Sequence, residues 1–136
     1  NYKTHAEKGS MYNTPPVFPI YVSMLTMRWI KQMGGLEAME KRNQVKAEIL
    51  YHEIDNNPCF EGTVVKEDRS WMNVVFVPKQ KEYETLFLEE CKKAGCVGLA
   101  GHRSVGGFRA SLYNALEKES VEVLVEVMQS FAHKYA

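Results

Sequence analysis

The feature that most constrains the fold is a change in the spacing of apolar residues along the chain. Near the carboxyl end, apolar residues recur at helical spacing, and seven of them share one face: Val121, Leu124, Val125, Met128, Phe131, Ala132 and Tyr135. The run from Trp71 to Val77 instead has the β-branched and aromatic residues of a strand, and Pro78 closes it. This combination predicts an α+β fold, in which helices pack on one face of a small antiparallel or mixed sheet.

Two further helices are predicted before the strand run. The first begins at Pro15, with Thr14 as its N-cap, and ends at the glycine pair 34–35. The second covers about residues 36–54 and is terminated by the sequence Asn-Asn-Pro at 56–58. The remaining spacing predicts a helix over 82–94 and two short strands, over 96–100 and 108–113.

The first of these helices has apolar residues on nearly every face. Such a helix is buried on several sides or lies in a subunit interface. A membrane span is the alternative, but Ser23, Thr26 and Arg28 interrupt the run, which makes it too polar to cross a bilayer. We therefore predict no membrane association.

Length and composition indicate one ordinary domain. The chain has 136 residues, and we divide it into a leading segment (1–14), two helices (15–55) and an α/β portion (56–136). Its 17 basic and 17 acidic residues give a formal net charge of zero, which argues against nucleic-acid binding because that function needs a basic face. The three cysteines form no C-x-x-C motif and are expected to be reduced thiols of a cytoplasmic protein.

Metal chemistry is not expected from this sequence. The four histidines, at positions 5, 52, 102 and 133, have no second histidine or cysteine at ligand spacing. The chain also has no phosphate-binding glycine motif of the Walker or dinucleotide-binding type, and no nucleophile motif. We therefore predict no metal site and no catalytic residue in this chain.

The segment 101–114 gathers the best candidates for a binding site. The forked guanidinium groups of Arg103 and Arg109 match a carboxylate or a phosphate bidentately, and His102 adds a donor. Gly106 and Gly107 let a ligand approach the main chain closely. This set suits recognition of a small molecule with two anionic groups. A solvated loop whose arginines pair with surface carboxylates is the alternative, and residue types alone leave it open.

Several stretches together resemble one enzyme family. They are MYNTPP at 11–16, GGL at 34–36, MEKRN at 39–43, RSWMNVVF at 69–76 and GHRSVGGFRASLYNA at 101–115. In this order they are similar to the carboxyl-terminal part of the phosphoserine aminotransferase family, over essentially the whole chain. The resemblance implies the small domain of a fold-type-I, pyridoxal-phosphate-dependent homodimer in the cytoplasm. Such enzymes exchange an amino group between phosphoserine and 2-oxoglutarate in serine biosynthesis, and some also act in pyridoxine biosynthesis.

The resemblance also implies roles for individual residues. Asn13 and Thr14 would contact the phosphate of the cofactor in the neighbouring subunit. Arg109 would bind the substrate α-carboxylate, and His102 with Arg103 would hold the distal anion, a phosphate in phosphoserine and a carboxylate in glutamate.

One element of the family pattern is absent from this sequence. We find no counterpart of the motif with the lysine that carries the cofactor, which lies in the larger domain of the family. The chain alone is therefore expected to be catalytically silent. The alternative from another class is a stand-alone anion-binding or dimerisation module that has the domain without the chemistry.

Overall fold

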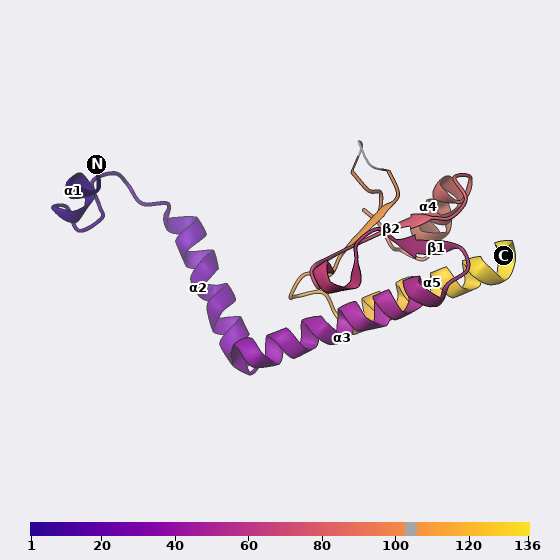
Figure 1. Cartoon of the computed structure of the whole chain (residues 1–136). Coiled ribbons are helices and arrows are strands. Elements are labelled where there is room, and N and C mark those ends of the chain that lie inside the picture. Colours follow the sequence, from indigo (N-terminus) through magenta and orange to yellow (C-terminus); the bar gives the residue numbers. More distant parts are fainter. Residues whose placement is uncertain (103–105) are drawn as a thin grey trace. The chain divides into compact units, whose positions relative to one another are not determined.

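The computed structural model describes residues 1–102 and 106–136, and the chain divides into two compact units, 1–39 and 40–136. The helices and strands follow one another along the chain as Figure 1 labels them. Their bounds are α1 (Tyr2–Ala6), α2 (Val17–Gln32), α3 (Gly35–Asn56), β1 (Phe60–Gly62), a 3-10 turn (Lys66–Asp68), β2 (Asn73–Pro78), α4 (Tyr83–Lys93), β3 (Phe108–Ser111) and α5 (Lys118–Tyr135).

The first unit contains α1 and α2, and neither helix has a buried residue. The prediction that Thr14 caps α2 was wrong, because the helix begins after Pro16 and no side chain caps it. The predicted end of α2 is confirmed. Gly34 and Gly35 adopt φ angles of +101° and +84°, a region that glycine enters without the steric cost other residues meet.

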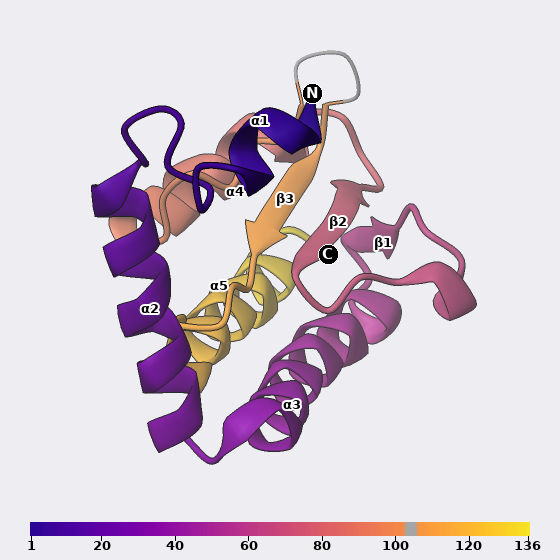
Figure 2. The same ribbon diagram turned by 90° about the vertical axis from the view of Figure 1, so that its left-hand side faces the viewer.

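The second unit is built on a three-stranded sheet in the order β1-β2-β3, with both pairs antiparallel. Figure 2 looks onto this sheet, with α4 and α5 farther from the viewer than the strands and α3 running below them. The predicted α+β class, with helices packed on one face of a small sheet, is thereby confirmed in its antiparallel form.

The core of this unit lies between that face of the sheet and the helices. Its centre is a cluster of buried phenylalanines, with neighbouring ring centroids 4.6–6.3 Å apart: Phe60, Phe76, Phe87, Phe108 and Phe131. The predicted stripe on α5 contributes four fully packed residues to this core: Val121, Leu124, Met128 and Phe131. The periodicity of α5 therefore reports core packing.

Two predictions about strands differ from the structure. Residues 96–100 do not form a strand, and only Ala100 makes a single bridge, to Phe108. Cys96 instead belongs to the turn that follows α4, since its backbone amide donates to the carbonyl of Cys91 (2.8 Å). Gly98 has a φ of +76°, which interrupts an extended strand. The third strand is β1, which we did not predict.

None of the helices in the described part of the chain is both long and apolar enough to cross a membrane.

Candidate functional site

The candidate site is centred on Arg109, which lies on the face of the sheet that the helices of the second unit leave uncovered. The strand predicted over 108–113 is present as β3, and its side chains alternate, with Phe108 and Ala110 buried and Arg109 exposed. Across β2 the partner of Arg109 is Val75, a side chain that accepts no hydrogen bond. Among the residues that the structure describes, the Arg109 guanidinium has no hydrogen-bond or ion-pair partner. An exposed cation on a rigid strand is available to bind an anion.

The chain that precedes β3 runs back along it. The amide of Gly101 donates to the carbonyl of Gly107 (2.8 Å), and the amide of Arg109 donates to that of Leu99 (2.7 Å). The amide of Gly106 then donates to the carbonyl of His102 (2.9 Å). These bonds fix the backbone near β3, and His102, which accepts one of them, is an exposed residue. The third predicted residue, Arg103, lies outside the described residues.

The glycine pair before β3 has two different environments. Gly107 has a φ of +66°, and a Cβ there would lie 2.7 Å from Cγ1 of Val77 and 2.8 Å from the carbonyl oxygen of Phe76. Gly106 has a φ of +74°, but a Cβ there would meet nothing closer than the Glu84 carboxylate, at 3.8 Å. Gly107 is therefore required both by its backbone angle and by close packing on β2.

The segment that follows β3 is fixed by a buried lysine from α3. The Lys46 ammonium donates to the carbonyls of Leu112 (3.1 Å), Tyr113 (2.7 Å) and Leu116 (3.1 Å), so all three of its hydrogens are engaged. Burial lowers the pKa of Lys46, and the nearby positive charge of Arg42 adds to this effect. Sequence reasoning missed this contact, because Lys46 lies 66 residues or more from its partners.

A cavity of about 440 Å³ lies at the edge of β3. The loop 94–99 and the first turns of α5 form its other walls, and its lining is mostly apolar. Arg109, Ser111 and Ser120 contribute polar groups to it. The volume is in the range of small-molecule sites, so there is room for a small ligand beside the arginine.

The other two predicted residues belong to the first unit. Asn13 and Thr14 lie in the segment between α1 and α2, and both are exposed. Within the described residues, neither side chain has a hydrogen-bond partner. Their amide and hydroxyl groups are therefore available to a ligand or to another chain.

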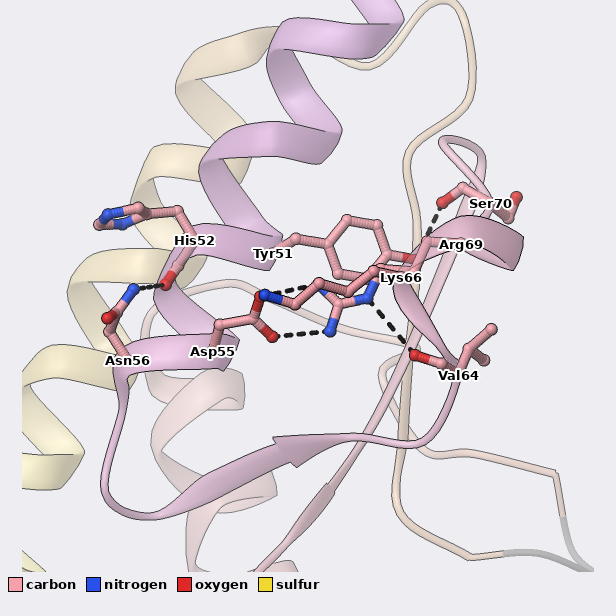
Figure 3. Close-up of polar contacts among 8 residues, drawn as sticks. All are labelled: Tyr51, His52, Asp55, Asn56, Val64, Lys66, Arg69 and Ser70. Carbon is pink, nitrogen blue, oxygen red and sulfur yellow. Dashed lines mark hydrogen bonds and ion pairs between the residues drawn. The ribbon is translucent and has the colours of Figure 1, made fainter.

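A second polar cluster ties the loop before β2 to α3 (Figure 3). Arg69 donates to both carboxylate oxygens of Asp55, at 2.9 and 2.6 Å, and its guanidinium carbon lies 4.5 Å from the centroid of the Tyr51 ring. The Tyr51 hydroxyl donates to the carbonyl of Ser70 (3.0 Å), and the Ser70 hydroxyl accepts from the amide of Asn73 (3.2 Å). Because all its charged groups are paired, we interpret this cluster as structural.

This cluster makes stability depend on pH. The hydrogen bonds from Arg69 hold the pKa of Asp55 below its usual value. A lowered carboxylate pKa stabilises the fold above the pKa of the unfolded state, near 4, and this contribution is lost as pH falls through the folded-state value. We expect Asp55→Asn to cost about 1–2 kcal/mol at pH 7 and progressively less below pH 4, as measured by urea unfolding from pH 3 to 7.

Glu61→Gln is the matched control for this prediction, because the Glu61 side chain is exposed and makes no hydrogen bond or ion pair in the described part of the chain. The free energy of unfolding of this variant should stay close to that of the wild type from pH 3 to 7. A cost of Asp55→Asn that stays constant from pH 7 to pH 3 would show that the ion pair contributes no pH-dependent stability.

Taken together, the site is equipped for anion binding. Arg109 and His102 lie on or beside one strand, whose two ends are fixed by Gly107 and Lys46. Within the described residues, no group of three histidine, cysteine, aspartate or glutamate side chains could hold a metal ion.

Comparison with known proteins identifies relatives over nearly the whole chain. A family model described as aminotransferase class-V matches residues 1–124. The phosphoserine aminotransferase of Bacteroides thetaiotaomicron is 56% identical over 133 residues, which cover 96% of this chain and 38% of the relative. That of Parabacteroides distasonis is 56% identical over 137 residues, which cover 99% and 39%. This chain thus spans about two fifths of the length of these curated relatives.

Two solved structures are similar as well. The phosphoserine aminotransferase from Bacillus circulans subsp. alkalophilus has a TM-score of 0.92 at 42% identity and matches 99% of this chain and 38% of its own. The pyridoxal-phosphate-bound phosphoserine aminotransferase from Trichomonas vaginalis has a TM-score of 0.85 at 40% identity and matches 94% and 37%.

Proposed function

The chain belongs to the aminotransferase class-V family, and we propose that it forms the carboxyl-terminal part of a phosphoserine aminotransferase. The proposed reaction converts phosphoserine and 2-oxoglutarate to 3-phosphohydroxypyruvate and glutamate, within serine biosynthesis in the cytoplasm. In this proposal the chain supplies substrate-binding residues, and the rest of the polypeptide supplies the catalytic apparatus. Action on the related phosphorylated intermediate of pyridoxine biosynthesis is part of the same proposal.

The observation that carries this function is the guanidinium of Arg109, which has no hydrogen-bond or ion-pair partner among the residues that the structure describes. It is exposed on the uncovered face of the sheet, on a strand fixed at both ends. We assign it to the substrate α-carboxylate, which both amino-acid substrates share. A guanidinium binds a carboxylate through two parallel hydrogen bonds, so it fixes the orientation of the ligand as well as its position.

The distal anion is assigned to His102 and Arg103. Phosphoserine has a phosphate at that end and glutamate a carboxylate, so the site must accept either group. A guanidinium and an imidazole suit both, because the oxygens of a phosphate and of a carboxylate both fit the guanidinium fork and both accept from an imidazole N–H. Two cationic groups at separate points on the ligand would hold the reacting carbon in one place, which is a large part of catalysis by positioning.

Pyridoxal phosphate is the proposed cofactor of the full-length protein, and it supplies the electron sink of amino-group transfer when bound. The amide of Asn13 and the hydroxyl of Thr14 are donors of the kind that a phosphate accepts, and their exposure fits a role in the site of a partner subunit. This assignment requires a homodimer. The lysine that carries the cofactor is assigned outside this chain. Lys46 is buried but does not suit this role, since three carbonyls occupy its ammonium.

The test of this function is an amino-transfer assay on the full-length protein with pyridoxal phosphate supplied. We expect transfer from O-phosphoserine to 2-oxoglutarate, and much poorer transfer from L-serine, which lacks the distal anion. Equal rates with both donors would contradict the assignment of a distal anion site. Failure to use O-phosphoserine at all would refute the proposed function.

A further inference from the structure

We propose that the side-chain amide of Asn73 is a second donor to the carboxylate held by Arg109. The inference rests on the proposed function and adds a substrate-binding residue to it. Asn73 belongs to the stretch 69–76, to which the sequence assigned no role in binding.

The register of the sheet brings Asn73 next to Arg109. Val75 pairs with Arg109, and Asn73 pairs with Ser111, so Asn73 is the diagonal neighbour of Arg109. The burial alternates along β2, which puts Asn73 and Val75 on the uncovered face that carries Arg109. Diagonal neighbours in an antiparallel pair are about 7–8 Å apart, a span that a long arginine and a bound carboxylate together bridge.

The hydrogen bonds of Asn73 leave its donors available. Its Oδ1 accepts from the Ser111 hydroxyl at 3.2 Å, which orients the amide. Its Nδ2 makes no hydrogen bond within the described residues, and the side chain is only partly buried. The backbone of Asn73 is fixed too, because its backbone N–H donates to the hydroxyl of Ser70, which lies at the end of the polar cluster of Figure 3. The two Nδ2 hydrogens are therefore preorganised donors beside a guanidinium that has no partner in the described part of the chain.

The polar neighbours of Arg109 on this face are few. On β2, on β3 and at the residue that precedes β3, the positions around it are occupied by Asn73, Val75, Val77, Ser111 and Gly107. Three of these have no polar side-chain group, and the Ser111 hydroxyl already donates to Asn73. Asn73 is therefore the neighbour with side-chain donors to spare. A purely structural role, as one half of a cross-strand polar pair, is the competing explanation.

Asn73→Asp separates the two explanations. The aspartate keeps an oxygen that accepts from Ser111, so the cross-strand pair survives, but it replaces the donors with a negative charge near Arg109. We expect KM for O-phosphoserine and for 2-oxoglutarate to rise by a similar factor, about 10- to 100-fold, because both ligands share the α-carboxylate. The dissociation constant of 2-oxoglutarate, measured by titration of the full-length protein, should rise by a factor similar to that of KM. Asn56→Asp, on α3, is the control with the same charge change, and it should leave both quantities unchanged.

Asn73→Ser covers the case in which the aspartate variant does not fold. It replaces the amide with a hydroxyl, which can accept from Ser111 across the strands but is too short to reach the ligand, so we expect KM to rise about 3- to 10-fold for both substrates. If the wild-type protein transfers the amino group but KM stays within twofold in the folded variants, the inference is overturned. The same holds if Asn56→Asp raises KM as much as Asn73→Asp. An inactive wild-type protein would instead refute the proposed function itself.

Discussion

Replacing Arg109 with leucine in the full-length protein is expected to lower kcat/KM for O-phosphoserine by about 30- to 5,000-fold. The reason is the loss of one partner of a desolvated, bidentate ion pair, which costs about 2–5 kcal/mol. Arg109 has no described partner within the protein, so its charge remains available to the ligand, and its loss is not offset by the release of another interaction. Misplacement of the reacting carbon adds to the loss in kcat.

Arg109→Lys is the conservative comparison. Lysine keeps the charge but lacks the planar fork of donors, so we expect a decrease in kcat/KM smaller than that of the leucine variant. The decrease should come from weaker substrate binding and not from a loss of stability. Urea unfolding should give similar stabilities for the wild type and both variants, because Arg109 is exposed and makes no described side-chain contact that folding requires. If the leucine variant had the kcat/KM of the wild type, the role assigned to Arg109 would be refuted, although the family membership of the chain would stand.

Replacing Gly107 with alanine is expected to destabilise the fold by about 2–5 kcal/mol. A φ of +66° costs an alanine about 1–2 kcal/mol, and its Cβ would overlap Cγ1 of Val77 and the carbonyl of Phe76, at 2.7 and 2.8 Å. The carbonyl belongs to the backbone of β2 and cannot move without breaking the pairing between β2 and β3. Urea unfolding measures the loss, and kcat/KM for O-phosphoserine should fall as well, because the same shift moves Arg109.

Gly98→Ala is the matched control. Gly98 has a φ of +76°, but a Cβ there would meet no atom within 4 Å, so that alanine carries the backbone cost without the overlap. We expect it to lose about 1–2 kcal/mol. Equal losses in the two variants would show that the close packing of Gly107 on β2 contributes nothing.

The sequence was sufficient where a pattern is long or strictly periodic. The stripe on α5 and the strand that begins at Phe108 were both confirmed, since each pattern is set by which side chains the core must bury. It failed where structure depends on distant partners. The three residues of β1 are too short to show a period, and they form a strand because they pair with β2. The apolar run 96–100 suggested a strand, but the turn that ends α4 and the positive φ of Gly98 take precedence there.

The candidate site shows the same division. The arginines and glycines of 101–109 stand together in the sequence, and from them we predicted an anion site. The residues that support them were not visible, because each acts over a long separation. Ser111 and Asn73 are 38 residues apart, Arg69 and Asp55 are 14 apart, and Lys46 is 66 from Leu112. Sequence patterns report local periodicity, whereas these contacts exist only once the strands are in register.

The central claim is that this chain supplies substrate recognition but not the chemistry. The most direct test assays residues 1–136 and the full-length protein side by side, with O-phosphoserine, 2-oxoglutarate and pyridoxal phosphate. We predict transamination by the full-length protein and none by the isolated chain, because no lysine suited to carry the cofactor is assigned to it. Robust transamination by the isolated chain would contradict that claim.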